Sequence, residues 1–267
     1  MPLITLLTDF GLEDTYVGQM KGAILATAPA AALVDLSHAV PSQDIQAGAF
    51  LLWSAVEAFA AGTIHVAVVD PGVGSSRRGL AIRCARGDTF VGPDNGLLVP
   101  AVDRLGGALT TVSLTRQPFW RTTANAASAT FHGRDVFGPV AGHLAVGVPL
   151  EDLGPVVTEI VGFALPRPNG RTGEVIHVDT YGNLVTNLPA TSLPKGRFKA
   201  RVGDKLAPSA AYYAAAQPKA LLALVGSAGL LEISARDASA AELTGAGRGT
   251  PVRVEPESAV SRRLRPG

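Results

Sequence analysis

Three acidic residues in the first half of the chain follow apolar, strand-like segments, where a carboxylate could hold a ligand. Asp9 closes "LITLLTD", Asp70 closes "TIHVAVVD", and Asp94 follows "TFVGP". In open α/β sheets, ligands bind beyond the carboxyl ends of the strands, so these side chains are predicted to surround one crevice. Aspartate is also a preferred residue of helix caps and turns, which is the role we expect for Asp14 and Asp44.

The segment "VVDPGVGSSRRG" could bring two opposite charges together. Pro71 fixes the turn after the strand, and the glycines permit backbone angles that a side chain forbids. Such a loop can fold back, so that an arginine grips the carboxylate of Asp70. Arg77 is one candidate and its neighbour Arg78 the other, and spacing alone does not separate them. The loop lacks the Gly-Lys-Ser/Thr sequence of a nucleotide P-loop.

His132 lies in "TFHGRDVFGP", between an aromatic residue and a glycine and just before a predicted helix. Histidine titrates near neutral pH and can therefore move or position a proton. A lone histidine is more often structural, and we interpret the others that way: His38, His65, His143 and His177. With no HExxH motif and one cysteine, Cys84, the sequence predicts neither a metal site nor a cofactor.

In the second half, "VDTYGNLVTN" places Asp179, Tyr181 and Asn183 on a tight turn between two strands. One interpretation is a hairpin turn and nothing more. The other is a binding site, because the turn offers a carboxylate for an ammonium group, an aromatic ring for a purine and an amide for base edges. Ser227 and Glu232, in "GSAGLLEIS", repeat this pattern more weakly.

Alternating strand-like and helix-like segments must position the first group of residues. Strands are predicted at "LITLLTD", "AALVDLS", "TIHVAVVD", "GLAIRCA" and "TFVGPD", with helices after Asp14 and Asp44 and over 97–105 and 136–146. Strands separated by helices predict a mainly parallel sheet covered on both faces. We therefore expect residues 1–165 to form an α/β catalytic domain.

The stretch "LPRPNGRTG" marks a change in the pattern of the chain. Beyond it come short strand-like segments punctuated by glycine and proline, with one helical patch near 239–243. This pattern is typical of a small antiparallel barrel or sandwich. We expect residues 166–267 to form an all-β, barrel-like second domain.

The composition excludes several classes of partner. The chain has 267 residues and a formal net charge of +1, so it lacks the basic surface of a nucleic-acid-binding protein. The most apolar helical stretch, 47–61, is too short to span a membrane and contains Glu57. No signal peptide is evident. We expect a cytoplasmic protein that binds neither nucleic acid nor membrane.

Taken together, these segments resemble the S-adenosyl-L-methionine (SAM) hydrolases, also called SAM hydroxide adenosyltransferases, which are relatives of the bacterial fluorinase and chlorinase. The motifs that carry the resemblance run in the family's order over nearly the whole chain: "TDFG", "VVDPGVGSSR", "GPDNG", "FHGRD", "DTYGNLVTN" and "GSAGLLEI". The resemblance implies cleavage of SAM by water at the ribose C5′, giving adenosine and methionine without a cofactor. It also implies a homotrimer whose active sites lie between the first domain of one subunit and the second domain of its neighbour.

The resemblance also implies a role for each candidate residue. Asp70, Arg77 and His132 correspond to the water-activating set. Asp9 would hold the ribose hydroxyls, and Asp179 would meet the methionine ammonium. The remaining contacts would be Asn183 at the adenine edge, Tyr181 and Phe131 beside the nucleoside, and Ser227 and Glu232 as further ligand contacts.

The halogenases of this family have Tyr at the positions of Asp70 and His132, Ser at the position of Gly133, and an extra loop for which this sequence has no room. A negative charge at residue 70 would repel a halide and orient water instead, which favours hydrolysis. A halogenase remains the alternative by ancestry. A purine nucleoside phosphorylase or nucleosidase and a non-catalytic SAM or adenosine sensor are the alternatives from other classes.

Overall fold

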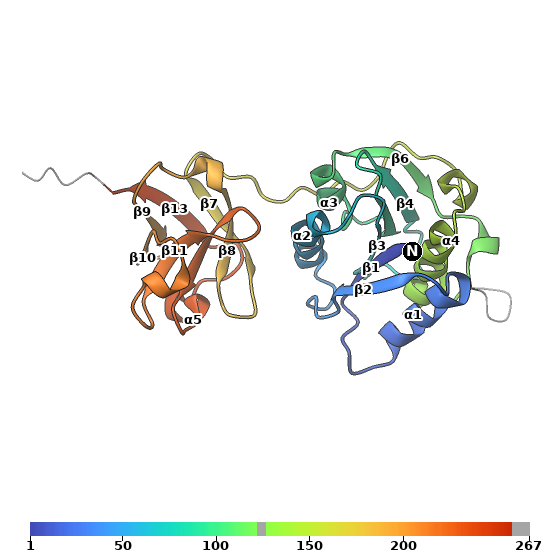
Figure 1. Cartoon of the computed structure of the whole chain (residues 1–267), viewed down its shortest axis with the longest axis horizontal. Helices are drawn as coiled ribbons and strands as arrows, with labels where there is room; N and C mark the ends of the chain where they lie inside the picture. The colour runs from blue at the N-terminus through green and yellow to red at the C-terminus, as the bar shows by residue number, and fades with distance from the viewer. Residues whose placement is uncertain (122–126, 258–267) are drawn as a thin grey trace, which may run out of the picture. The chain divides into compact units, whose positions relative to one another are not determined.

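The computed structural model describes residues 1–121 and 127–257 (Figure 1). The chain divides into two compact units, Met1–Ala164 and Leu165–Gly267. The first unit buries two hydrophobic clusters and the second buries one. Across the described residues, no helix is both long and apolar enough to cross a membrane.

A six-stranded sheet in the order β2-β1-β3-β5-β4-β6 organises the first unit. β2, β1, β3 and β5 pair in parallel, whereas β4 pairs antiparallel with both β5 and β6. The mainly parallel sheet is therefore confirmed, with one reversed strand. The strands are β1 (Leu3–Thr8), β2 (Ala32–Ser37), β3 (Ile64–Val68), β4 (Gly79–Cys84), β5 (Thr89–Pro93) and β6 (Ala108–Ser113).

Helices cover both faces of this sheet, because successive side chains of its strands point to opposite faces. Ile4 and Leu6 pack with residues of α1 and α4, whereas Leu7 packs with residues of α2 and α3. Figure 1 shows the two pairs of helices on either side of the strands. The helices are α1 (Tyr16–Thr27), α2 (Ile45–Ala55), α3 (Val99–Arg104) and α4 (Gly138–Ala145).

Three local features differ from the sequence-based expectations. Asp44 caps α2 as predicted, by accepting a hydrogen bond from the Ala47 amide at 3.0 Å, but Asp14 caps nothing, since Thr15 precedes α1 and no side chain bonds its first turn. The threonine-rich strand β6 was not predicted. The helix expected over 136–146 begins instead as a π-helical turn, Gly133–Phe137, that leads into α4.

The second unit is a seven-stranded, all-antiparallel sheet in the order β10-β9-β13-β7-β8-β12-β11. A single bridge between Ser209 and Ala223 brings its two edges together, so the sheet is nearly closed around its core, as the predicted barrel requires. Its elements are β7 (Thr172–Val178), β8 (Leu184–Pro189), β9 (Phe198–Val202), β10 (Lys205–Pro208), β11 (Leu221–Val225), β12 (Leu230–Ala235), α5 (Ala240–Thr244) and β13 (Pro251–Pro256).

Candidate active site

The loop after β3 folds back on itself and closes an ion pair. The Val73 amide donates to the Asp70 carbonyl at 3.2 Å, and the Ser75 hydroxyl donates to the Gly72 carbonyl at 2.7 Å. These turns return the chain, so that Nη2 of Arg77 donates to Oδ2 of Asp70 at 2.5 Å. Both side chains are almost fully buried, with 5% of Asp70 and 9% of Arg77 exposed.

His132 joins this pair from a distant part of the sequence. It immediately precedes the π-helical turn, and its Nδ1 lies 3.0 Å from Nη2 of Arg77. A guanidinium has only hydrogens to give, so Nδ1 must accept and the proton of the neutral ring lies on Nε2. One arginine nitrogen thus uses one hydrogen for Asp70 and the other for His132.

Close contact between two loops holds the three groups together. Gly74 has a positive φ of +77°, and a Cβ added there would lie 2.2 Å from the carbonyl oxygen of Ala129. Only glycine fits this approach without a shift of the backbone. The loop that carries Arg77 therefore rests directly on the segment that leads to His132.

Burial sets the charge state of the two titrating groups. It raises the pKa of Asp70 above its usual value although the guanidinium of Arg77 opposes this shift. Burial, and then the positive charge of Arg77, lowers the pKa of His132 below its usual value. The pKa of His132 therefore lies below 6.5, which leaves its ring neutral at neutral pH, while the ion pair with Arg77 favours the charged form of Asp70.

A cavity of about 230 Å³ opens in front of this constellation. Asp70 lines it, and the buried Oδ1 of Asp70 makes no hydrogen bond of ordinary geometry with the described residues. Asp9 lines the same cavity from the end of β1, where its Oδ2 accepts a hydrogen bond from the Gln43 amide at 2.8 Å. The remaining polar and aromatic walls are Phe10, Ser42, Gln43, Thr130, Phe131 and His132.

The geometry separates Arg77 from Arg78. Arg78 donates from Nε and Nη2 to Oδ2 of Asp94, at 2.9 and 2.5 Å, and from Nη2 to the Glu159 carbonyl at 2.7 Å. The other oxygen of Asp94 accepts from the Val161 amide at 2.8 Å. Asp94 is thus a buried anchor for the chain after residue 158 and does not line the crevice with Asp9 and Asp70. The expectation of three carboxylates around one crevice was wrong in this respect.

In the second unit, the turn between β7 and β8 uses Asp179 internally. Oδ1 of Asp179 accepts from the amides of Tyr181 and Asn183, both at 2.9 Å, and Oδ2 accepts from Nδ2 of Asn183 at 2.9 Å. Gly182 at the turn has a φ of +79°, and a Cβ there would lie 2.1 Å from the Ser239 hydroxyl. Asp179 therefore stabilises the turn on which Tyr181 is exposed, and it fixes the side chain of Asn183.

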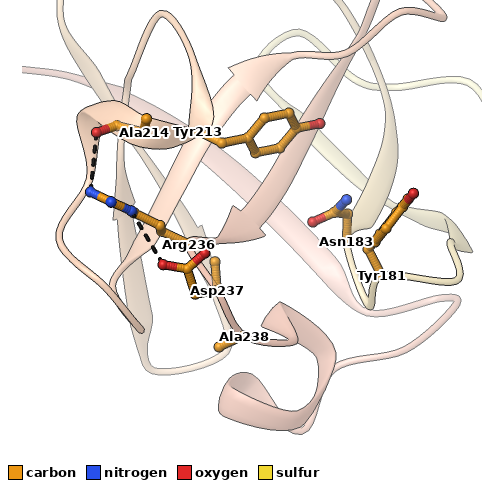
Figure 2. Close-up of a pocket in the computed structure, with 8 residues that line it drawn as sticks. Tyr181, Asn183, Tyr213, Ala214, Arg236, Asp237 and Ala238 are labelled. Carbon is orange, nitrogen blue, oxygen red and sulfur yellow. Dashed lines mark hydrogen bonds and ion pairs between the residues drawn. The ribbon is translucent and has the colours of Figure 1, made fainter.

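A second cavity, of about 760 Å³, opens beside this turn. Figure 2 shows Tyr181 and Asn183 on one side of it, with Tyr213, Arg236 and Asp237 on the other. Sequence reasoning missed the last three. The signals that could have found them are the paired tyrosines in "AAYYAAA" and the charged pair that follows β12 in "EISARDAS".

The structure does not bring Ser227 and Glu232 into either cavity lining. Ser227 is exposed in the turn between β11 and β12. Glu232 is buried, and its Oε1 accepts from the Tyr213 hydroxyl and from Ser234 Oγ, both at 2.7 Å. Burial and the neighbouring Glu232 raise the pKa of Tyr213 to about 12, so the phenol stays protonated. Glu232 acts on the cavity through Tyr213.

Two other histidines are held by hydrogen bonds away from the first cavity. His65 is fully buried, with Nδ1 2.7 Å from Thr5 Oγ1, and burial lowers its pKa to about 4. Nδ1 of His38 lies 2.7 Å from Thr8 Oγ1, and its Nε2 is 3.1 Å from Asp35. Among the residues that the structure describes, no three His, Cys, Asp or Glu side chains are gathered as a metal ion would need.

Two family models match the chain over most of its length. Residues 4–154 match the N-terminal domain of SAM hydroxide adenosyltransferases, and residues 173–253 match their C-terminal domain. The chain belongs to the SAM hydroxide adenosyltransferase family. The resemblance drawn from six motifs is therefore confirmed.

Full-length relatives of this SAM hydroxide adenosyltransferase family member carry a hydrolase name. The protein named (R)-S-adenosyl-L-methionine hydrolase from Salinispora arenicola is 42% identical, with 95% of this chain and 97% of the relative covered. The one of the same name from Thermus thermophilus is 41% identical, with 93% and 97% covered. A Fluorinase from an Actinoplanes species is more distant, at 28% identity over 73% of this chain and 74% of the relative.

A solved structure has the same fold. The crystal structure of an uncharacterized conserved protein from Thermotoga maritima matches with a TM-score of 0.87 and 32% identity, covering 94% of this chain and 99% of that one.

Proposed function

We propose that this protein hydrolyses SAM to adenosine and L-methionine by attack of water on the ribose C5′. The observation that carries the proposal is the single nitrogen, Nη2 of Arg77, that donates to both Asp70 and His132 at the wall of one cavity. The hydrolase names of relatives at 38–42% identity support it. Because those names specify the (R) compound, we extend the proposal to the (R) epimer at sulfur.

The reaction needs a positioned nucleophile more than it needs an acid. The water oxygen forms a bond to C5′ as the C5′–S bond breaks, and the electron pair of that bond neutralises the sulfonium to a thioether. The departing methionine therefore takes up no proton. What the protein must supply is orientation of the water and a place for its proton.

The tautomer of His132 determines which group orients the water and which group accepts its proton. With Nδ1 accepting from Arg77, His132 presents the Nε2 hydrogen and orients the water as a donor. Oδ1 of Asp70 is buried, without an ordinary hydrogen bond, and belongs to a carboxylate of raised pKa. We assign the proton of the water to this oxygen, from which it passes to solvent as products leave.

The same charges disfavour the halogenase alternative. A halide would have to lie beside the carboxylate of Asp70 in a buried cavity, where like charges repel strongly. The nucleophile of the hydrolysis is instead an uncharged water molecule, which a carboxylate can orient by accepting a hydrogen bond. The ion pair with Arg77 neutralises only part of the charge of Asp70. The remaining charge repels an anion but does not repel water.

In the proposed function, Asp9 and Phe131 bind the nucleoside part of SAM in the first cavity. A carboxylate can accept from both ribose hydroxyls at once, and Oδ2 of Asp9 is already fixed by the Gln43 amide. Phe131 is 9% exposed and lines the same cavity, where it would pack against the nucleoside. No cofactor takes part in this scheme.

We further propose a homotrimer in which the cavity of Tyr181 and Asn183, contributed by a neighbouring copy, holds the adenine. Complementation tests this arrangement. D70N and N183A chains, each inactive alone, are co-expressed with different tags and purified as mixed trimers. Shared sites predict that activity returns, because some sites then combine two unaltered halves. Mixed trimers without activity would contradict shared sites, and light scattering checks the trimer itself.

Product analysis tests the function. Purified protein is incubated with (R)-SAM in buffer containing chloride, and the products are identified by mass spectrometry. We expect equal amounts of adenosine and methionine. Free adenine would identify a nucleosidase or phosphorylase, 5′-halo-adenosine a halogenase, and calorimetric binding without products a sensor. Each of these results would overturn the proposal.

A further inference from the structure

One fully buried carboxylate outside the catalytic set ties down the segment that carries His132. Asp135 has no exposed surface, yet its carboxylate accepts four hydrogen bonds from three residues. Nε and Nη2 of Arg134 donate to its two oxygens at 2.6 and 2.8 Å, the Ser128 amide donates at 2.8 Å, and Nη1 of Arg121 at 3.3 Å. The carboxylate thereby closes the stretch 128–135 into a loop, with His132 inside it.

Arg134 has a second contact, with the aromatic wall of the cavity. Its guanidinium carbon lies 5.0 Å from the centroid of the Phe131 ring, and its Nη1 donates to Oε1 of Gln19 on α1 at 2.9 Å. Phe131 is packed edge-on against Phe10 at 5.5 Å and Tyr16 at 5.3 Å. The guanidinium of Arg134 thus packs against the Phe131 ring, and Phe10 and Tyr16 pack against it as well.

The backbone between these contacts has little freedom. The Asp135 amide donates to the Phe131 carbonyl at 3.1 Å, and a π-helical turn begins at Gly133. A Cβ on Gly133 would lie 3.0 Å from the Phe10 ring and 3.3 Å from Phe131. Any loosening of the loop therefore moves the His132 ring relative to Arg77 and to the cavity.

We propose that Arg134 is a positioning residue of the active site, which holds His132 and Phe131 in place by chelating Asp135 and covering the Phe131 ring. The inference rests on the proposed hydrolysis of SAM. Arg134 lines a neighbouring cavity of about 460 Å³ that shares Asp9 and Phe131 with the cavity in front of Asp70, but it does not line the latter. Its effect on His132 therefore passes through Asp135 and Phe131. Lysine cannot replace it, because an ammonium group has neither the planar fork nor the flat face that these contacts use.

Steady-state hydrolysis of SAM by R134K and R134Q tests this role, with R121Q as the matched control. Arg121 donates to the same carboxylate, but over a longer distance and from a side chain that is 45% exposed, so R121Q should keep wild-type kinetics. We expect kcat to fall about tenfold to a hundredfold in R134K and R134Q, the scale of a small misplacement of reacting groups. We expect KM to rise by a smaller factor than kcat falls, because Phe131 loses its support while the substrate contacts assigned to Asp9 and to the second unit remain.

R134K is the deciding variant, because it keeps a positive charge beside the buried carboxylate and thus the fold. Circular dichroism and Tm are measured for each protein, and kcat is calculated from the concentration of folded enzyme. A merely structural role would lower Tm and leave kcat of the folded protein within about twofold of wild type; that result would overturn this inference alone. A wild type that forms no adenosine would overturn the proposed function, and this inference with it.

Discussion

Arg77 and His132 are 55 residues apart in sequence, and their side chains meet with 3.0 Å between Nη2 and Nδ1. Because the guanidinium can only donate, this contact fixes the tautomer of the ring and turns a donor, Nε2–H, away from Arg77. His132 can therefore orient a water molecule through that hydrogen but cannot take a proton there. Oδ1 of Asp70, the oxygen that Arg77 does not bind, becomes the proton acceptor in this account.

Substitutions of Asp70 and His132 test this division of roles. D70N and H132A should each lower kcat for SAM hydrolysis by about two orders of magnitude or more, the scale of a lost acid–base partner. H132Q should recover part of the loss, because its amide restores a donor, whereas the amide oxygen of D70N can accept a hydrogen bond but is too weakly basic to take a proton. D204N, at a carboxylate that is 81% exposed, is the control. If D70N hydrolysed SAM at the wild-type rate, Asp70 would not be the acceptor.

Variants of the two neighbouring arginines should differ in which quantity changes: kcat for Arg77 and Tm for Arg78. R77Q removes the donor shared by Asp70 and His132, so kcat should fall about a hundredfold or more. R78Q breaks the contacts with Asp94 and the Glu159 carbonyl, so Tm should fall while kcat of the folded protein stays near wild type. Parallel measurement of kcat and Tm checks both. A stable but inactive R78Q, beside an active R77Q, would reverse the assignment.

The acid limb of the pH profile follows from the shifted groups. Activity requires an ionised Asp70 and a neutral His132. The pKa of Asp70 is raised above 3.8 and that of His132 is lowered below 6.5. We therefore expect kcat to be level at neutral pH and to fall with decreasing pH between those two values. H132Q removes one titrating group, so its limb should reflect Asp70 alone; a midpoint above 6.5 in the wild type would contradict these shifts.

The contact between Gly74 and the Ala129 carbonyl should be sensitive to a single methyl group. G74A adds a Cβ at 2.2 Å from that oxygen, in a residue with φ of +77°. G62A is the matched control, because its φ is +86° but its Cβ would meet nothing within 4 Å. Each should lose about 1 kcal/mol of stability from backbone strain, and G74A should in addition lose kcat. Equal kcat in both variants would show that the loop contact does not position Arg77.

Local patterns predicted the fold class and an arginine beside Asp70, whereas the place of His132 beside them and the choice of Arg77 came only from the resemblance to the family, because these groups are far apart in sequence or indistinguishable by spacing. Buried strands and their terminal aspartates are visible as apolar runs, and a glycine-rich loop after Asp70 predicts a nearby arginine. The choice between Arg77 and Arg78 was not visible, because adjacent residues of an extended chain point to opposite sides and only the three-dimensional partners decide. Asp94 looked equivalent to Asp70 because each follows a buried strand, and only its partner in the folded chain, Arg78, shows that it serves another purpose.

In the second unit, sequence patterns were less informative. Glu232 was expected to contact the ligand, but a carboxylate on a buried strand needs hydrogen-bond partners, and Tyr213 and Ser234 supply them. Tyr213 lies 19 residues away from Glu232 in sequence, and the tyrosine pair that contains it gives no sign of which residue it contacts. Such a residue is recognised only when the folded barrel brings the two segments together.

Hydrolysis in water enriched in oxygen-18 tests the central claim most directly. The protein is incubated with (R)-SAM, and adenosine and methionine are isolated and analysed by mass spectrometry. The account predicts one labelled oxygen in the 5′-hydroxyl of adenosine and none in methionine, because solvent attacks C5′. Adenosine without label, or label in homoserine beside 5′-methylthioadenosine, would contradict it.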